Sequence, residues 1–259
     1  MMGGLQELYN QRYTGDYREY LGGYEIARWA ALAHFIPHIV AINTAKTVLD
    51  YGAGNGLHVA LWERLFPEAS LHFCDISSVA RDKFRLKYPK HADTYRLVHD
   101  NQANFADNSF DTVVSVEVME HVEDLPAYLQ DIYRLLKPGG WFVWTTPCAN
   151  KFSIEHVASY LTGKIEKTNE GYRRWQWEDP THLRRLKSRE IKALLEKIGY
   201  SEILFRFRAH LFSYVCTYWL PPDRFSAQKD KLMTWDYRLF RRLPNGASML
   251  GSARKLRQQ

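Results

Sequence analysis

The fold is decided by Val48-Leu49-Asp50-Tyr51-Gly52-Ala53-Gly54-Asn55-Gly56, an apolar run that passes into alternating glycines. Glycine at every second position lets the backbone turn tightly and approach a ligand where a side chain would clash. Apolar residues then recur at helical spacing from Leu57 to Leu65, so we expect a strand, a turn and a helix. A helix that begins after Gly56 would point free N–H groups at an anionic group.

Two common nucleotide-binding motifs are incomplete at this turn. A dinucleotide fingerprint needs G-x-G-x-x-G, but Leu57 stands where its last glycine belongs. A phosphate-binding P-loop would end in Gly-Lys-Ser or Gly-Lys-Thr, and no such tripeptide follows. The turn therefore favours a cofactor other than NAD or a nucleoside triphosphate.

Short apolar runs alternate with helical patterns on both sides of this stretch, which is typical of a parallel sheet covered by helices. The pattern predicts an α/β fold with a Rossmann-like, seven-stranded, mostly parallel sheet, helices on both faces and an antiparallel last strand. The expected strands are residues 47–50, 71–74, 95–98, 110–116, 141–145, 200–208 and 247–255.

The same pattern suggests how the chain is divided. Residues 1–44 are expected to form an N-terminal helical cover, and residues 45–259 the main domain. Within that domain, residues 147–182 are too long for a plain connection and are expected to form a substrate lid. Residues 210–245 are expected to be an insertion before the last strand.

Composition narrows the class of protein. The chain has 259 residues and a formal net charge of +6, and the part from Phe205 onward alone carries a net +8. The three cysteines, Cys74, Cys148 and Cys216, form no C-x-x-C pair, so neither a disulfide framework nor a zinc site is expected. We see no secretory signal and no apolar stretch of about 20 residues, and predict a cytoplasmic protein.

Polar residues stand at the ends of the next two predicted strands. Asp75 ends the second, where a carboxylate can accept hydrogen bonds from both hydroxyls of a ribose. His99-Asp100-Asn101 ends the third, where an acid or amide suits an adenine amino group. Each acid has a simpler interpretation as a helix cap or a turn former. Together they favour adenosine bound at the carboxyl edge of the sheet.

These motifs together resemble the class I S-adenosylmethionine-dependent methyltransferases, especially the ubiquinone/menaquinone-biosynthesis-like small-molecule branch. The resemblance covers roughly residues 45–146 and resumes later in the chain. Besides the glycine stretch, Asp75 and Asp100, it rests on SFDTVVSVEVMEHV (109–122), LLKPGGWFV (135–143) and THLRRLKSREIKALLEKIGY (181–200). Ala53 stands where many relatives carry Cys, Thr or Ser.

The resemblance implies S-adenosylmethionine as cofactor and a role for each matching residue. The glycines at 52, 54 and 56 would line its methionine part, with Asp50 orienting the loop and reaching the amino group through water. Those loop glycines are Gly52, Gly54 and Gly56. The other implied contacts with the cofactor are Asp75 on the ribose, Ile76 on the adenine face, Asp100 and Asn101 at the adenine edge, and Glu117 beside the sulfonium.

Methyl transfer is an in-line displacement, so the protein mainly supplies alignment and a dry pocket. A sugar hydroxyl would also need a general base, and His182 and His121 are the candidates, His182 slightly ahead. A capping or hydrogen-bonded structural imidazole is the alternative for each. We see no set of acids and amides for a catechol-type metal site, and expect no metal.

The expected acceptor wall is the aromatic and basic run 172–178, with Tyr13 and its N-terminal neighbours Tyr9, Arg12 and Tyr17 completing the cover. Its candidate contacts are Tyr172, Arg173, Trp175 and Trp177, which suit a planar or anionic acceptor. A surface lid packed by its own tryptophans is the alternative. Cys148 follows the fifth strand rather than the fourth, so it is expected to be inert rather than a nucleophile.

The favoured function is methyl transfer to an oxygen of a metabolite, a glycan or a lipid-linked intermediate. Two alternatives stay open: an RNA or protein methyltransferase that uses the basic C-terminal region, and a non-catalytic cofactor-binding partner protein. The Asn/Asp-Pro-Pro-aromatic motif of base methylation is absent after Val116, and no DNA partner is expected. The apolar run 211–220 with its basic surround fits a lid, a homodimer contact or peripheral contact with an anionic membrane.

Overall fold

The computed structural model describes residues 2–15, 17, 23–40, 44–167, 173–175, 179–218, 220 and 226–257. One eight-stranded sheet organises them, in the spatial order β4-β3-β2-β1-β5-β6-β10-β9. In that order its strands are Gln102–Ala103, Tyr95–His99, Ser70–Asp75, Thr47–Tyr51, Phe110–Val116, Leu136–Pro147, Ser248–Lys255 and Tyr200–Arg208. The seven predicted strands are all present, and the two-residue β4 adds an edge strand.

The sheet is mostly parallel, as predicted. Strands β3, β2, β1, β5 and β6 pair in parallel, while β10 runs antiparallel to both β6 and β9. Its centre is β5, where Val113, Val114 and Val116 are almost completely buried. Because helices cover both faces, central parallel strands of this kind carry continuous apolar runs.

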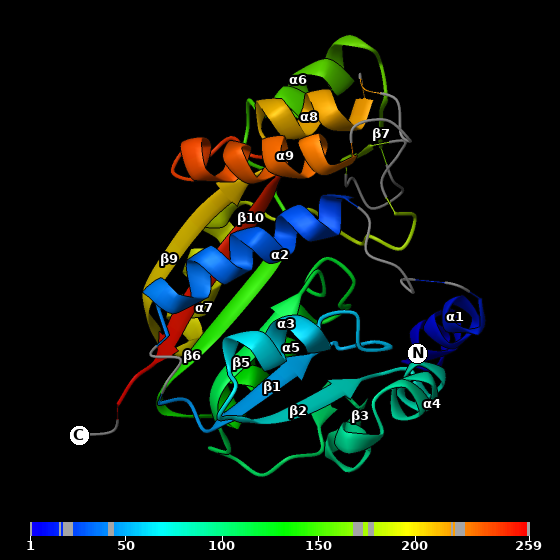
Figure 1. Cartoon of the computed structure of the whole chain (residues 1–259), viewed down its shortest axis with the longest axis vertical. Coiled ribbons are helices and arrows are strands. Elements are labelled where there is room, and N and C mark those ends of the chain that lie inside the picture. The colour runs from blue at the N-terminus through cyan, green and yellow to red at the C-terminus, as the bar shows by residue number, and fades with distance from the viewer. Residues whose placement is uncertain are drawn as a thin grey trace.

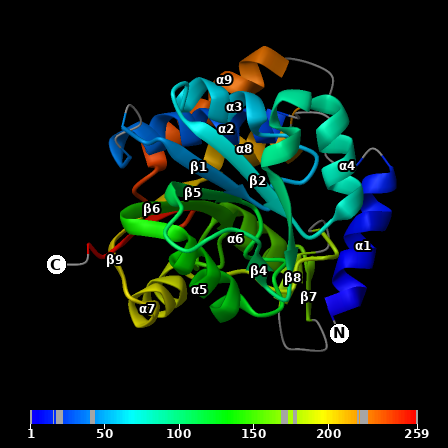
Figure 2. The same cartoon turned by 90° about the horizontal axis from the view of Figure 1, so that it is seen from below.

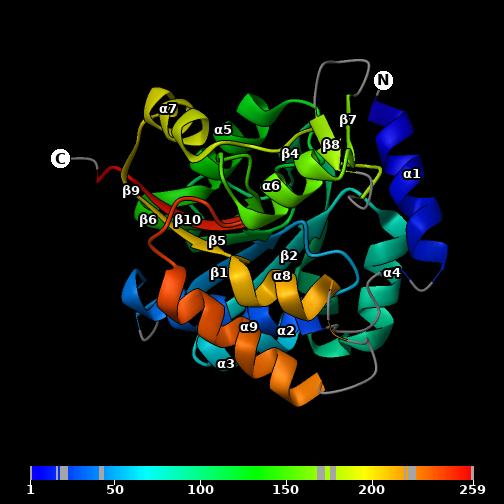
Figure 3. The same cartoon turned by 90° about the horizontal axis from the view of Figure 1, so that it is seen from above.

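Helices lie on both faces of the sheet (Figures 2 and 3). One face carries α2 (Gly23–Phe35), α3 (Val59–Leu65) and α9 (Ser226–Phe240), and the other carries α5 (Leu125–Leu135) and α7 (Ser188–Ile198). Helix α8 (Leu211–Tyr218) contacts both α9 and α6 (Ile154–Leu161), and Figure 1 shows these three helices far from α1 (Met2–Thr14) and α4 (Ser78–Lys87). The remaining elements are η1 (Ile36–His38), η2 (Pro89–Thr94) and a separate hairpin of β7 (Ile165–Lys167) and β8 (Arg173–Trp175).

Local sequence explains where these helices begin and end. Asp124 caps α5 by accepting a hydrogen bond from the Ala127 N–H at 2.9 Å. Gly199, at a φ of 112°, ends α7 in the left-handed conformation that glycine adopts without strain. The helix after the glycine loop was predicted to begin right after Gly56, but α3 begins at Val59, because the loop keeps turning through His58.

The two N-terminal helices have different positions. Ala31, Leu32 and Phe35 of α2 share a buried core with residues of β1 and β5, so α2 packs against the sheet. Helix α1 instead packs against α4 at the β2–β3 side of the molecule. The division into a cover of residues 1–44 and a domain of residues 45–259 stays a prediction. None of the helices described here has the length and apolarity to cross a membrane.

Candidate active site

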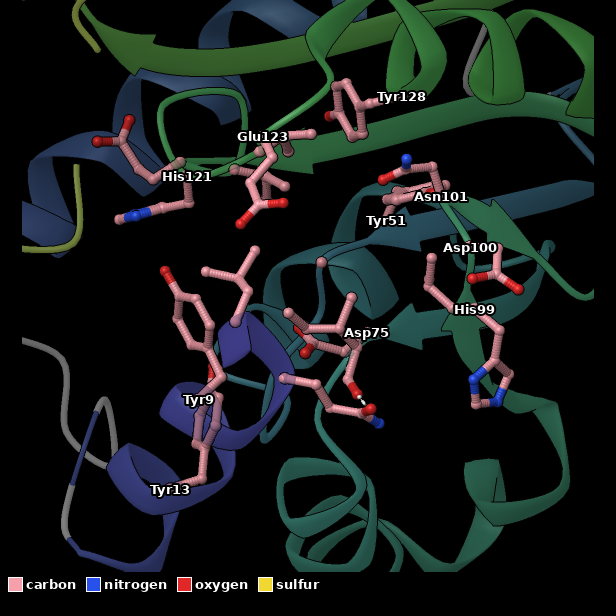
Figure 4. A pocket seen from close by; sticks show the side chains of 18 of the residues that line it. Tyr9, Tyr13, Tyr51, Asp75, His99, Asp100, Asn101, His121, Glu123 and Tyr128 are labelled. Carbon is pink, nitrogen blue, oxygen red and sulfur yellow. Dashed lines mark hydrogen bonds between the residues drawn. The ribbon is translucent and has the colours of Figure 1, made fainter. Parts of the chain in front are cut away.

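A cavity of about 230 Å³ opens where β1, β2, β3 and β5 reach their carboxyl ends. Helix α1 forms its opposite wall. Figure 4 shows His121 and Tyr9 on one side of the cavity, His99 and Asp100 on the other, and Asp75 between them. The lining residues with polar or aromatic side chains are Gln6, Tyr9, Tyr13, Tyr17, Tyr51, Asp75, His99, Asp100, Asn101, Glu117, His121, Glu123 and Tyr128.

The glycine loop lies at the floor of this cavity, but only Gly52 lines it. All three glycines have positive φ values, +87° at Gly52, +54° at Gly54 and +88° at Gly56. Side chains from elsewhere in the chain cover the other two: a Cβ on Gly54 would lie 2.2 Å from the Tyr13 hydroxyl, and one on Gly56 2.6 Å from the Tyr88 ring. Gly54 and Gly56, which were predicted to line the cofactor, are thus covered by aromatic side chains. Their role is to let the loop backbone pass close to these rings.

The predicted adenosine contacts do come together. Asp75, Ile76, Asp100 and Asn101 all line the cavity. The Asp75 carboxylate accepts hydrogen bonds from the backbone N–H groups of Gly54 and Ser77, each at 2.9 Å, which fixes its orientation. These two bonds use one acceptor position on each oxygen of a group that has about four such positions in all.

Asp50 is buried beneath the loop and is not among the lining residues. Its Oδ2 accepts a hydrogen bond from Trp62 Nε1 at 2.7 Å, while Oδ1 has no hydrogen-bond partner in the part of the chain described above. Burial raises the pKa of Asp50 to about 7, despite the lowering effect of the Trp62 hydrogen bond. Direct contact between Asp50 and a ligand is therefore disfavoured, and its predicted contact through water fits this position.

Glu117 follows β5 and closes the other side of the cavity. Its φ of 55° turns the chain out of the strand, and its carboxylate is held from two directions. Thr145 Oγ1 donates to Oε1 at 2.7 Å, and Arg28 of α2 lies 3.2 Å from Oε2. Both members of the Glu117–Arg28 pair are buried.

The two predicted base candidates meet each other. His121 lines the cavity, and the rings of His121 and His182 are 4.7 Å apart in an edge-to-face arrangement, although His182 is not a lining residue. His121 Nδ1 lies 3.2 Å from the Thr181 carbonyl oxygen, to which it donates in one tautomer. Tyr9 packs edge-on against His121 at 5.8 Å. His121 and His182, which are far apart in the sequence, therefore form a pair of contacting imidazole rings.

Glu120 is a neighbour of this pair that the sequence analysis missed. It is completely buried, and its Oε2 accepts a hydrogen bond from Thr146 Oγ1 at 2.9 Å. Burial, and after it the charge of Glu117, raises the pKa of Glu120 to about 8. One ligand atom from each of Glu120, His121 and His182 lies within 4.8 Å of the others, a grouping that the sequence analysis, expecting no metal, did not anticipate. The available signal was E-x-x-E-H over 117–121.

Helix α1 lies over the cavity and contacts the loop that carries His182. Arg12 pairs with Asp179 at 2.6 Å and donates to Thr181 Oγ1 at 2.6 Å. Burial alone would raise the pKa of Asp179, but hydrogen bonds from Arg12 and Thr181 hold it well below its usual value. Tyr9, Tyr13 and Tyr17 line the cavity near Arg12, and their contact with the acceptor stays a prediction.

Only part of the predicted acceptor wall lies within the described residues. Tyr172 and Trp177 lie outside the described residues, and Arg173 and Trp175 lie on β8. Lining residues that the sequence analysis did not single out include Gln6, Tyr51 and Tyr128, which it had no reason to separate from core or surface positions. Burial raises the pKa of Cys148 to about 11, consistent with the inert thiol that was expected.

Comparison with known proteins agrees with this geometry. A family model described as a methyltransferase domain matches residues 20–203, more than two thirds of the chain. The chain belongs to this methyltransferase family. The assignment confirms the resemblance to class I S-adenosylmethionine-dependent methyltransferases, the Rossmann-like fold and S-adenosylmethionine as the cofactor.

The individual relatives are distant and differ in their acceptors. The chain is 31% identical over 119 residues to the ubiquinone/menaquinone biosynthesis C-methyltransferase of Desulfotalea psychrophila. This match covers 45% of this chain and 48% of that protein. It is 38% identical over 109 residues to the dimethylglycine N-methyltransferase of Parasynechococcus marenigrum, covering 39% of this chain and 38% of that one. The matches thus span about half or less of either relative.

A solved structure extends the likeness in fold to nearly the whole chain. Phosphoethanolamine N-methyltransferase 2 of Haemonchus contortus, in complex with S-adenosyl-L-methionine, superposes with a TM-score of 0.58 at 19% identity. The superposition covers 96% of this chain and 60% of that one. At this identity the likeness concerns the fold alone.

Proposed function

We propose that this chain transfers a methyl group from S-adenosylmethionine to an oxygen atom of a small-molecule acceptor. The observation that carries the proposal is the cavity, which has strand-end acids and an amide at one side and the His121 imidazole with Tyr9 at the other. A cofactor held by the first side would present its reactive end toward the second.

The residues present fit the cofactor. Asp75 offers oriented carboxylate oxygens for ribose hydroxyls, Ile76 an apolar face for the adenine, and Asp100 and Asn101 polar edges. Beneath the loop, Asp50 Oδ1 is a buried acceptor without a partner among the described residues, suited to a water that meets an ammonium group. S-adenosylmethionine supplies a methyl group on a cationic sulfur, which leaves as a neutral thioether when the acceptor oxygen takes the methyl carbon.

The chain's own residues would supply alignment, charge and proton transfer. Glu117 places a buried carboxylate at the reactive end, and α1 limits the access of water to it. The histidine pair suits removal of a hydroxyl proton from the acceptor, because one imidazole nitrogen of His121 faces Thr181 and orients the ring. His121 lines the cavity, so its position favours it over His182 as the group that meets the acceptor.

The choice of an oxygen acceptor follows from the histidine pair rather than from the relatives. Two of the relatives are named as a C-methyltransferase and an N-methyltransferase, so relationship alone does not select the acceptor atom. The histidine pair favours oxygen, since a hydroxyl needs a base more than an amine or an activated carbon does. Contacts through residues 210–245 with a membrane surface or a second copy of the chain stay predictions.

Calorimetric binding is the first test. The native chain should bind S-adenosylmethionine and its demethylated product in the micromolar range, and Asp75→Ala should weaken both by about 100-fold, as expected for loss of a charged hydrogen-bond acceptor. Asp93→Ala is the matched control, because Asp93 is an exposed acid preceding β3. No binding to the native chain, with NAD titrated in parallel, would overturn the proposal.

Turnover is the second test, with phenols and glycan intermediates as first acceptors. Methylation of a hydroxyl that falls at least about 100-fold in His121→Asn, with cofactor binding retained, supports the proposal. Tight cofactor binding without turnover on any acceptor would favour a non-catalytic partner protein. Salt-sensitive binding and methylation of RNA would favour the macromolecular alternative.

A further inference from the structure

The imidazole pair at the reactive side of the cavity has a carboxylate beside it. Glu120 and His121 follow β5, whereas His182 comes from the loop before α7, and the Leu183 N–H joins the two segments by donating to the Glu120 carbonyl oxygen at 2.8 Å. One ligand atom from each of the three side chains lies within 4.8 Å of the others. The fold therefore gathers one oxygen and two nitrogen donors from distant parts of the sequence.

The carboxylate of this cluster is incompletely satisfied. Glu120 is 0% exposed, and Thr146 Oγ1 bonds Oε2. Across the described ranges, Glu120 Oε1 has no hydrogen-bond partner. A buried carboxylate is costly unless charges or hydrogen bonds compensate it. Glu117 adds a second carboxylate nearby, and the charge of His182 acts in the opposite direction. A cation held by all three side chains would compensate the buried carboxylate at the place where the donors meet.

The orientation of His121 is also that of a metal ligand. Its Nδ1 lies 3.2 Å from the Thr181 carbonyl oxygen and 3.1 Å from Thr181 Oγ1. A ligating imidazole commonly donates one ring N–H to a carbonyl, which fixes the tautomer and directs the other nitrogen's lone pair at the ion. Thr181 is itself held by Arg12, so the ring is supported from α1.

We propose that Glu120, His121 and His182 bind a divalent transition-metal ion of the zinc type at the wall of the cavity. Imidazole nitrogen with carboxylate oxygen suits zinc, cobalt(II) and iron(II) better than it suits magnesium or calcium. Donor atoms on a tetrahedral ion with bonds of about 2.0–2.2 Å lie roughly 3.4 Å apart, so the three side chains draw together on binding. Three protein ligands leave a further coordination position.

This site changes what the histidines do in the proposed reaction. An imidazole that gives its lone pair to a metal cannot use the same pair to take a proton from the acceptor. With the ion bound, an acceptor hydroxyl that coordinates it becomes more acidic and releases its proton to water. This consequence rests on the proposed methyl transfer, whereas metal binding itself does not.

The test is metal binding to the full chain after removal of adventitious metal with a chelator. We expect one zinc ion per chain with micromolar or tighter affinity, and at least 10-fold weaker binding of magnesium. Substitution with cobalt(II) should give visible absorption that reports nitrogen ligands. Absence of stoichiometric zinc binding, or magnesium binding as tight as zinc binding, overturns the proposal without the use of any variant.

Variants then locate the site. Glu120→Gln and His182→Ala should each weaken zinc binding at least 10-fold, while the control His38→Ala, an exposed histidine of η1, should leave it unchanged. Zinc binding that neither variant weakens, with far-ultraviolet circular dichroism showing both folded, places the ion elsewhere and overturns the assignment.

Binding of S-adenosylmethionine to the same preparations separates this inference from the proposed function. Cofactor binding without metal binding refutes the metal site alone. Metal binding without cofactor binding refutes the proposed function and leaves the metal site in place.

Discussion

Arg12 and Asp179 stand 167 residues apart in sequence and form an ion pair in which Nη2 of Arg12 lies 2.6 Å from Oδ2 of Asp179. A second hydrogen bond, from Nη1 to Oδ1 at 3.1 Å, makes the contact bidentate. This pair joins α1, one wall of the cavity, to the loop that carries Thr181 and His182. Bidentate arginine–carboxylate pairs are the form of ion pair in which geometry and energy are both well defined.

Breaking this pair should loosen the wall of the cavity. We expect Asp179→Asn to weaken S-adenosylmethionine binding roughly 10-fold, equivalent to about 1.4 kcal/mol, because α1 then closes over the cofactor at a free-energy cost. Because the pKa of Asp179 is depressed in the folded chain, the pair persists below the usual carboxyl pKa, and its contribution is lost only as pH falls toward the depressed value. Calorimetry checks the affinity, with Arg189→Gln, an exposed arginine of α7, as control. Equal affinities for Asp179→Asn and the control would show that the pair does not support the site.

The contact between Gly54 and Tyr13 gives a second prediction. A Cβ on Gly54 would lie 2.2 Å from the Tyr13 hydroxyl oxygen and 3.1 Å from the ring carbon that bears it. Gly54→Ala should therefore displace Tyr13 and weaken cofactor binding by 10-fold or more, since the φ of +54° adds strain of about 1 kcal/mol. Adding Tyr13→Phe removes the closest atom and should restore part of the affinity.

Gly4→Ala is the matched control for this glycine, because a Cβ there meets nothing within 4 Å. Calorimetric titration of the single and double variants measures the coupling between positions 13 and 54. If Tyr13→Phe restores nothing, the loss in Gly54→Ala comes from backbone strain alone and the contact with Tyr13 is unimportant.

The parts of the fold that sequence predicts are those set by local pattern. The buried valines of β5 and the strand-end position of Asp75 follow from residues that are adjacent in the chain. Parallel strands end at one edge of a sheet, so the adenosine side of the cavity could be assembled from strand ends. This reasoning placed Asp75, Ile76, Asp100 and Asn101 together.

The other parts of the site depend on tertiary contacts that bring distant segments of the chain to the carboxyl edge of the sheet. The approach of His182 to Glu120 depends on the 179–183 loop, whose anchors at Arg12 and at the Glu120 carbonyl have no local sequence signal. Likewise, the spacing of Gly54 could not show that a tyrosine of α1 would cover it. Sequence reasoning therefore identified both histidines but missed the Glu120 carboxylate beside them.

The buried Asp50 predicts an unusual dependence of stability on pH. Its pKa of about 7 in the folded chain exceeds the ordinary value near 3.9, so the folded state binds its proton more tightly than the unfolded state does. Stability should therefore fall as pH rises between about 4 and 7, by roughly 2–3 kcal/mol from pH 5 to pH 7 for this group. Glu120, with a pKa of about 8, acts in the same direction.

Urea unfolding at about pH 5 and about pH 7 tests this on the native chain and on Asp50→Asn, which cannot ionise. The variant should lose less stability over this range and keep the share due to Glu120. Asp93→Asn, at an exposed position, is the control and should follow the native chain. A variant that loses as much stability as the native chain would mean that Asp50 titrates at an ordinary pKa.

The buried pair of Arg28 and Glu117 links α2 to the reactive side of the cavity. Arg28 Nη2 lies 3.2 Å from Glu117 Oε2, and their side chains are only 6% and 8% exposed. Removing one member of a buried ion pair typically costs about 3–5 kcal/mol, because the remaining charge stays buried. Arg28→Met keeps the length and much of the volume of the side chain, so its effect should come mainly from the lost charge.

We therefore expect Arg28→Met to lower the free energy of unfolding by about 3 kcal/mol, and the double variant Arg28→Met/Glu117→Gln to recover much of that loss. Recovery is expected because a neutral amide can still accept the hydrogen bond from Thr145 Oγ1, which Glu117 accepts at 2.7 Å. Arg64→Met, at an exposed position of α3, controls for the substitution. If the double variant is no more stable than Arg28→Met, packing of the arginine rather than its charge supports α2 on the sheet.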